Sequence, residues 1–136
     1  MKNRLAVLAL ALLVFTQIAL PWDADARRRD RWEFLGQRSV TDRVDHDVIA
    51  VTAAKGTFRA LQLRVKGRAV QFRDVKIHFA DGQDQDVELR HVIPAGGQSR
   101  VIDVNGRDRV VRSVEFWYDA QSILGKRAEV ELYGLN

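Results

Sequence analysis

The sequence predicts an all-β protein, an antiparallel β-sandwich of about eight strands. Three observations lead to this prediction. Apolar and polar residues alternate with a period of two over most of the chain after residue 31, which is typical of strands with one buried face. Turn sequences separate these stretches at intervals of roughly 8–12 residues. Cysteine is absent, so the packing of two sheets has to stabilise the domain without disulfides.

The first strands are expected between residues 32 and 66. Residues 32–40 alternate with a break at Gly36, and residues 48–51 form a short apolar run behind a polar stretch. Residues 58–66 alternate regularly and predict a half-buried strand. A turn follows at residues 66–68, because Gly67 accepts the positive φ that a tight reversal requires.

The middle of the chain predicts two further strands joined by a hairpin. The inward positions change parity between Phe72 and Val75, so we expect a β-bulge near residues 73–74. The dipeptide Asp81-Gly82 is a strong hairpin signal. In residues 87–93 apolar and polar residues again alternate, which predicts a strand that ends before Pro94.

The C-terminal part predicts three more strands, at residues 101–104, 109–118 and 128–133. A turn at Asn105-Gly106 separates the first two, and a polar loop precedes the last. In the long middle strand the predicted inward residues are Val110, Val114, Phe116 and Tyr118. Val130 and Leu132 are the predicted inward residues of the last strand.

Residues 1–26 predict a cleaved export signal. Lys2 and Arg4 precede an almost unbroken apolar run over residues 5–20, and small residues at Ala24 and Ala26 match the spacing that signal peptidase reads. Cleavage after Ala26 would give a periplasmic or secreted protein with no transmembrane segment in its mature form. The domain organisation is then a signal peptide (1–26), a basic N-terminal arm (27–31) and one β-sandwich domain (32–136).

The alternative is an uncleaved anchor in the inner membrane. The apolar run is short against the ~20 residues of a spanning helix, but four arginines follow the predicted cleavage site. They are Arg27, Arg28, Arg29 and Arg31. Positive charge at this place slows translocation and favours keeping that end in the cytoplasm.

Several short motifs, taken together, resemble a known family. They are Trp32-Glu33-x-Leu35-Gly36, Asp47-Val48-Ile49, Phe58-Arg59-Ala60-Leu61, Ala95-Gly96-Gly97, Ile102-Asp103-Val104, the stretch 112–118 and the closing Gly134. In this order they resemble small exported bacterial proteins catalogued only as a domain of unknown function. The resemblance implies export and a β-domain, and it brings no catalytic residues. Residues 130–134 also resemble the closing strand of discoidin-type, galactose-binding-like sandwiches, which implies a jelly-roll-like arrangement.

Candidates for metal binding or acid–base chemistry are few. His46 lies between Asp45 and Asp47, but adjacent side chains of an extended segment point to opposite sides, so a solvated loop is the expected structure. His78 shares the outward parity of its strand and is expected to be exposed. His91 shares the inward parity of its neighbours and is expected as a hydrogen-bonded residue at the rim of the core.

Other chemistry finds little support in the sequence. The three carboxylates of residues 81–86 lack the order of a calcium loop and fit a hairpin leading into an edge strand. No serine or threonine stands in a nucleophile motif, although a fold bringing His91 near Ser99 or Ser113 stays open. We therefore predict no catalytic residues, no metal, no cofactor and no enzymatic activity. Export and the mixture of acids with bases disfavour nucleic acid.

Two features favour binding. The arginines of the arm (Arg27, Arg28, Arg29 and Arg31) would attract anionic lipid or another polyanion. Trp117 and Tyr133 have the parity opposite to the apolar residues of their strands, so both rings are expected to face outward. Outward aromatic rings offer flat faces to a sugar ring or to a partner protein.

The sequence thus predicts an exported, non-enzymatic binding or interaction module of the bacterial envelope, with a glycan or an anionic envelope component as its ligand. The first alternative is a structural or assembly protein that pairs with a partner strand through a sheet edge. A small hydrolase is the third possibility.

Overall fold

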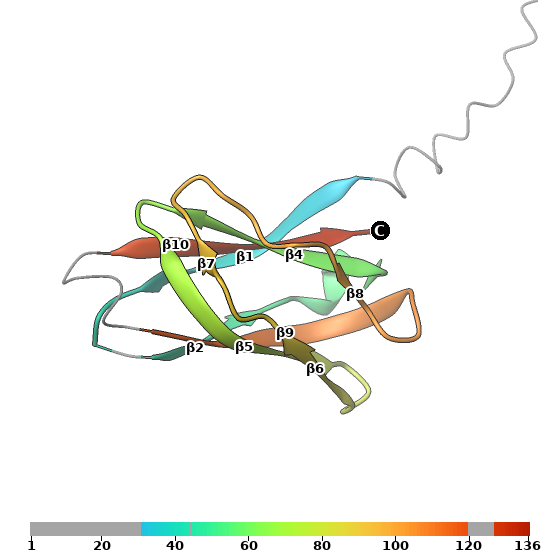
Figure 1. Ribbon diagram of the computed structural model, residues 1–136. Coiled ribbons are helices and arrows are strands. Elements are labelled where there is room, and N and C mark those ends of the chain that lie inside the picture. Colours follow the sequence, from blue (N-terminus) through green and yellow to red (C-terminus); the bar gives the residue numbers. More distant parts are fainter. Residues whose placement is uncertain (1–30, 44, 120–126) are drawn as a thin grey trace, which may run out of the picture.

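A computed structural model describes residues 31–43, 45–119 and 127–136, which form a two-layer β-sandwich (Figure 1). Sheet A has the strand order β1-β10-β4-β8, and sheet B has the order β2-β9-β5-β6. The short strands β3 and β7 pair with β9 and β5. The bounds are β1 Trp32–Val40, β2 His46–Ala50, β3 Thr57–Phe58, β4 Ala60–Lys66, β5 Val70–Phe79, β6 Asp84–Glu88, β7 Val92–Ile93, β8 Ile102–Asp103, β9 Arg109–Tyr118 and β10 Ala128–Leu135, with a 3-10 turn at Ala53–Lys55.

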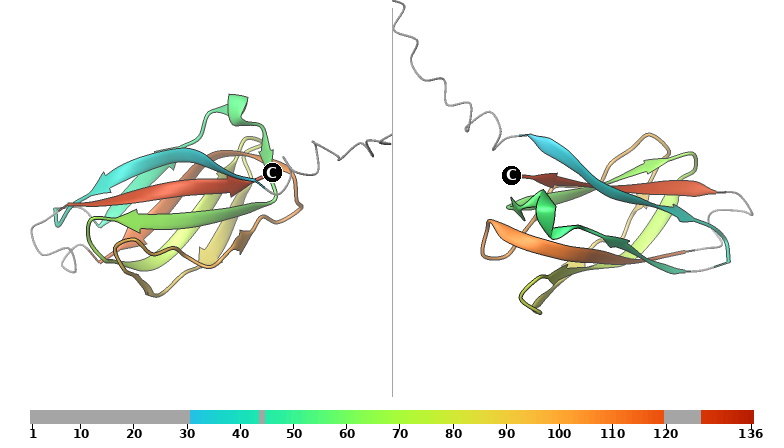
Figure 2. Two further views of the ribbon diagram at one scale, coloured as in Figure 1. Left: turned by 90° about the horizontal axis from the view of Figure 1, so that it is seen from above. Right: turned by 180° about the vertical axis from the view of Figure 1, so that it is seen from behind.

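The eight principal strands have jelly-roll topology. When β3 and β7 are set aside, the strands pair from the two ends of the chain inward. The pairs are β1 with β10, β2 with β9, β4 with β8, and β5 with β6. Successive antiparallel pairs alternate between the two sheets, whose layers can be followed from above and from behind in Figure 2. This confirms the predicted antiparallel sandwich of about eight strands; the two-residue strands β3 and β7 are additional.

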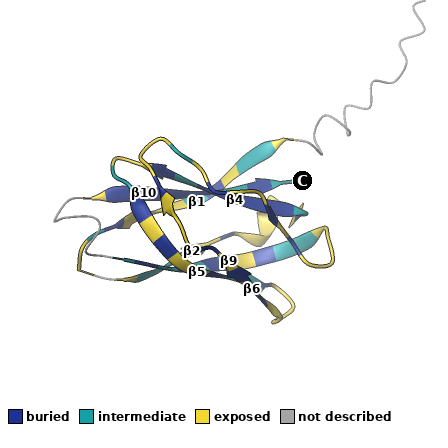
Figure 3. Ribbon diagram, viewed as in Figure 1, coloured by how far each residue is buried: buried dark blue, intermediate teal, exposed yellow. Residues whose placement is uncertain are grey.

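Apolar side chains from both sheets fill the space between the layers. Figure 3 shows buried residues alternating with exposed ones along β5, as the period-two pattern predicted. The core is rich in aromatic rings: Phe58, Phe72, Phe79, Phe116 and Tyr118 are each at most 1% exposed. The Tyr118 hydroxyl donates a hydrogen bond to Asp47 over 2.8 Å. Burial, and next the Asp47 carboxylate, raise the pKa of Tyr118.

The turns and irregularities lie where the sequence predicted them. The hairpin between β5 and β6 turns at Gly82, whose φ is +88°, and the register of β5 against β9 shifts between Phe72 and Asp74. β1 is irregular between Phe34 and Gly36. The predicted turns at Gly67 and Gly106 have positive φ, but each carries the chain from sheet A to sheet B rather than closing a hairpin.

Three predictions of burial are wrong. His78 keeps its outward parity but is half-buried, because Glu115 of β9 and Asp84 of β6 contact its ring. Val110 is only half-buried, and Val111 takes the core position, because a register shift between His78 and Phe79 moves β9 by one residue. His91 is exposed, although Leu89 and Ile93 on either side are buried. The ladder of β6 ends at Glu88 and pairing resumes only at β7, so the alternation does not continue through His91.

The predicted signal peptide and Arg27, Arg28 and Arg29 lie outside the described residues, whereas Arg31 is exposed just before β1. Among the residues that the structure describes, no helix is long and apolar enough to cross a membrane.

Candidate functional site

The outward face of sheet B carries a dense group of polar and charged side chains. The register of its four strands places the outward residues in three rows that run across the sheet. From β2 to β6 these rows are His46–Trp117–Asp74–Glu88, Val48–Glu115–Lys76–Asp86 and Ala50–Ser113–His78–Asp84. Residues in one row are directly opposite their neighbours, and residues in adjacent rows reach one another diagonally. The fold therefore gathers side chains that are far apart in sequence.

Trp117 lies on this face, half-buried, as its parity predicted. The ring of His46 packs beside the indole, with the centroids 5.0 Å apart and the planes inclined by 33°. His46 is opposite Trp117 in the register of β2 and β9, so the contact follows directly from strand pairing.

A continuous hydrogen-bonded chain begins at His46. Its Nε2 lies 2.5 Å from Oε2 of Glu115, and Oε1 of Glu115 lies 2.8 Å from Nε2 of His78. The other ring nitrogen of His78, Nδ1, lies 2.6 Å from Oδ1 of Asp84. Four residues from four strands thus form one network, which we call the His–Glu network (His46, Glu115, His78 and Asp84).

The charges in this network are mutually stabilising. The hydrogen bond to Glu115 raises the pKa of His78, with a further contribution from Asp84, while burial opposes the shift. The hydrogen bond from His78, and next the one from His46, lower the pKa of Glu115. A histidine that donates from both ring nitrogens to carboxylates is an imidazolium. The geometry therefore favours a protonated His78 between two ionised carboxylates.

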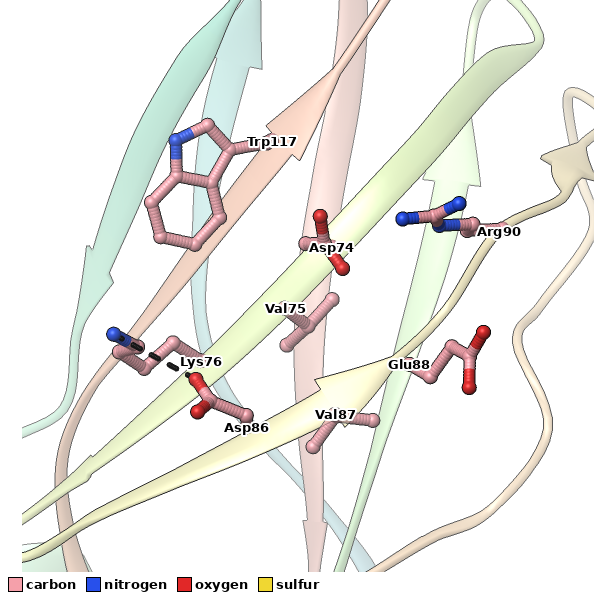
Figure 4. A pocket seen from close by; sticks show the side chains of 8 residues that line it. All are labelled: Asp74, Val75, Lys76, Asp86, Val87, Glu88, Arg90 and Trp117. Atoms are coloured by element: carbon pink, nitrogen blue, oxygen red, sulfur yellow. Dashed lines mark ion pairs between the residues drawn. The ribbon is translucent and has the colours of Figure 1, made fainter.

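A shallow cleft of about 500 Å³ lies next to the His–Glu network. It is lined by Asp74, Val75, Lys76, Asp86, Val87, Glu88, Arg90 and Trp117. In Figure 4 the Asp74 carboxylate lies between the Trp117 indole and the Arg90 guanidinium, and Lys76 pairs with Asp86 over 3.6 Å. Within the described part of the chain, the side chains of Asp74, Glu88 and Arg90 have no hydrogen-bond or ion-pair partner. The cleft thus combines the aromatic face of Trp117 with two unpaired carboxylates that can accept hydrogen bonds and one unpaired guanidinium that can donate them.

Tyr133 lies on the outward face of sheet A, on β10, so it does not share a surface with Trp117. The Arg64 guanidinium covers the Tyr133 ring at 3.7 Å from its centroid, and the edge of Phe34 packs against it. The hydroxyl donates to Glu131, a carboxylate only 4% exposed that also pairs with Lys66 over 2.7 Å. The ring is held within a local polar cluster, and its flat face is already occupied.

The segment 45–47 is not the loop that the sequence predicted, because β2 begins at His46. As expected for an extended segment, His46 and Asp47 point to opposite sides: His46 joins Glu115, and Asp47 accepts from Tyr118 and pairs with Arg38. Within the described ranges, no group of three or more His, Asp or Glu side chains is placed to hold a metal ion.

The carboxylates of residues 81–86 take separate partners. Asp81 pairs with Arg109, Asp84 with His78, and Asp86 with Lys76. Ser99 is buried, with its hydroxyl donating to the Arg100 carbonyl and accepting from the Leu63 amide. In the row that contains Ser113, His78 and Asp84, Nε2 of His78 is bonded to Glu115, so it does not stand ready to take a proton from Ser113.

Sequence reasoning missed the His–Glu network and the part of the cleft beyond Trp117. The outward parity of His78, and the shared face of Glu115 and Trp117, were both visible in the sequence. What joins them is the pairing of β9 with both β2 and β5, and alternation within one strand carries no information about its neighbours.

These observations define the protein as a jelly-roll β-sandwich with a tryptophan-lined cleft on one sheet. Over residues 6–134 the sequence matches the family described as Domain of unknown function (DUF2541), and the chain belongs to that family. This confirms the resemblance to an uncharacterised family; the likeness of residues 130–134 to galactose-binding-like sandwiches stays a prediction.

No curated protein matches the chain. Among solved structures, the chain is similar to one described as "Structural and functional characterization of Pseudomonas aeruginosa AlgX", with 14% sequence identity and a TM-score of 0.52. The match covers 74% of this chain and 26% of that one. At this identity the similarity concerns the fold alone.

Proposed function

We propose that the protein is an exported, non-enzymatic binding module of the bacterial envelope, and that the outward face of sheet B binds a glycan. The observation that carries the proposal is the cleft in which the half-buried Trp117 lies beside Asp74 and Arg90. The absence of an enzymatic activity stays a prediction.

The residue types of the cleft suit a sugar ring. The apolar face of a pyranose packs on an indole, and stacking on an aromatic side chain contributes about 1–3 kcal/mol in nucleic-acid complexes, which we use as an analogy. The hydroxyl groups of a sugar need both hydrogen-bond acceptors and hydrogen-bond donors. The Asp74 carboxylate can accept, and the Arg90 guanidinium can donate. A cleft of about 500 Å³ is within the range of small-ligand sites.

The charge of this face favours a neutral or amino-substituted glycan over a polyanion. Around Trp117 the cleft carries Asp74, Asp86 and Glu88 against Lys76 and Arg90. Glu115 and Asp84 add two negative charges beside it, of which a protonated His78 offsets one. A surface with this balance repels a polyanion at long range. The predicted attraction to anionic envelope components therefore belongs to the arginine arm, not to this face.

The alternative role in assembly through a sheet edge has less support. The edge strand β6 carries exposed Asp84, Asp86 and Glu88, which oppose pairing with another strand. The longer edge strand β1 is interrupted between Phe34 and Gly36, and such irregularities also discourage pairing along an edge.

The test is binding of neutral tetrasaccharides built from glucose, galactose or N-acetylglucosamine, measured by isothermal titration calorimetry on the purified protein. Trp117→Ala should weaken the best of these interactions by about 5- to 150-fold, which corresponds to the stacking free energy. Phe34→Ala is the matched control, since Phe34 is an aromatic residue 43% exposed on the opposite sheet, and it should leave the affinity unchanged.

Two results would contradict the proposal. One is that none of these saccharides binds. The other is that Phe34→Ala weakens binding as much as Trp117→Ala does. Thermal unfolding of Trp117→Ala checks that the variant is folded: truncation of a half-exposed ring should cost well under the 3–5 kcal/mol of a buried aromatic residue.

A further inference from the structure

We propose that the His–Glu network positions the Trp117 indole for its ligand, and that binding weakens as His78 loses its proton. The inference rests on the proposed function, because it concerns the regulation of the same site. It stands on the contacts that link His78 to Trp117 through Glu115 and His46.

The first step is the contact between His46 and the indole. The His46 ring packs against Trp117 with centroids 5.0 Å apart, and its Nε2 is held by Glu115 at 2.5 Å. The position of the His46 ring, and with it one side of the indole, therefore depends on where the Glu115 carboxylate is held.

The second step is that His78 holds this carboxylate in place. Each oxygen of Glu115 has one imidazole partner, His46 on Oε2 and His78 on Oε1. His78 is anchored in turn by Asp84 through its other nitrogen. Glu115 and His78 are each only 20% exposed in their side chains, so water competes weakly for these bonds.

The third step is the effect of deprotonation. A neutral imidazole has one N–H, so it can donate to Glu115 or to Asp84 but not to both. The carboxylate that loses its donor then faces a lone pair, and the positive charge between the two carboxylates is lost. If the N–H stays on Nδ1, Glu115 keeps only the restraint from His46; if it stays on Nε2, His78 loses its anchor at Asp84 and holds Glu115 less firmly. In both cases the His46 ring beside Trp117 is held less firmly.

The surrounding charges do not replace this link. On β5 and β6 the other charged groups facing the network are Lys76 and Asp86, which pair with each other over 3.6 Å. On β9 and β2, apart from His46 of the network itself, the facing neighbours of Glu115 and His78 are uncharged: Ser113, Val48 and Ala50. Asp74 faces the opposite side of Trp117, toward the cleft.

The experiment has a ligand-free part, in which NMR follows the His78 ring and the indole N–H of Trp117 as the pH is raised. The Trp117 resonance is assigned by its loss in Trp117→Phe. In the wild type the two signals should change with the same midpoint. In Glu115→Gln, which lacks the charge that links the two histidines, the Trp117 signal should no longer follow His78. A Trp117 signal in the wild type that does not move at the midpoint of His78 would overturn the inference.

The ligand part measures the affinity for the best tetrasaccharide below and above the His78 midpoint. Affinity should fall by about fivefold or more as His78 deprotonates. His78→Gln should bind weakly on both sides of the midpoint, and His91→Gln, at an exposed histidine outside the network, should behave like the wild type. Affinity that is independent of pH, or that His78→Gln leaves unchanged, would overturn the inference.

The two parts separate this inference from the proposed function. If no saccharide binds while Trp117 follows His78, the glycan proposal and its pH dependence are wrong, and only the positioning of Trp117 is supported. If saccharides bind through Trp117 with no response to His78, the proposed function stands and this inference fails.

Discussion

Replacement of Gly134 by alanine should destabilise the protein through a clash in the core. Gly134 lies in β10 with β1 on one side and β4 on the other. A Cβ built on it would lie 2.5 Å and 2.9 Å from two carbons of the Phe58 ring and 2.8 Å from Cδ1 of Leu35. Phe58 is fully buried, so its ring cannot swing into solvent.

The size of the effect follows from overpacking. An extra methyl group in a well-packed core typically costs about 1–3 kcal/mol. The lower entropy of the unfolded chain with alanine returns about 0.4–1 kcal/mol. The 2.5 Å contact with the Phe58 ring puts the cost in the upper half of that range, so the net loss is about 1–2.6 kcal/mol. For a domain of this size this loss should lower the Tm by several degrees, on the order of 10 °C at the upper end.

Thermal and urea unfolding of Gly134→Ala, Phe58→Leu and the double variant would measure this effect. In the Phe58→Leu background the smaller side chain leaves room for the methyl group, so Gly134→Ala should cost less than it does in the wild type. An unchanged Tm for Gly134→Ala, or an equal cost in both backgrounds, would refute this account of the packing.

Three further predictions concern pH, processing and the basic arm. Because the pKa of His78 is raised on folding, its stabilising contribution is complete below the unfolded-state pKa of about 6.5 and is lost as pH rises through the folded-state pKa. The stability measured by urea unfolding should therefore fall more from about pH 6 to about pH 9 in the wild type than in His78→Gln, and equal losses would contradict this. Mass spectrometry of the exported protein should give an N-terminus at Arg27, whereas full-length protein in the inner membrane would favour the anchor. Deletion of residues 27–31 should weaken binding to anionic vesicles at low salt with little change in Tm, because exposed charges act through a screened field and bury little area; equal vesicle binding would leave the arm without this role.

Much of the fold could be predicted from local pattern. The alternation along β5 and β10, the hairpin at Gly82 and the bulge near Asp74 each depend on residues close in sequence. The turns at Gly67 and Gly106 were visible as turns. That both pass from sheet A to sheet B was not visible, because a glycine with positive φ permits either path.

The site was predictable only in part, for the same reason. The outward position of Trp117 follows from the parity of one strand. Its contact with His46, and the link from Glu115 to His78, depend on which strands flank β9 and in which register. His91 shows the converse failure: its parity predicted burial, but the break between β6 and β7 removed the regular alternation on which parity depends.

The central claim is that the outward face of sheet B around Trp117 is the ligand-binding surface. The most direct measurement is an NMR titration of the isotopically labelled protein with the best-binding neutral tetrasaccharide. The account predicts that shifted resonances gather at Trp117, Asp74, Arg90 and their neighbours on β5, β6 and β9, while those around Tyr133 on sheet A stay fixed. Shifts centred on Tyr133 and Phe34, or no shifts with any of the saccharides, would contradict it.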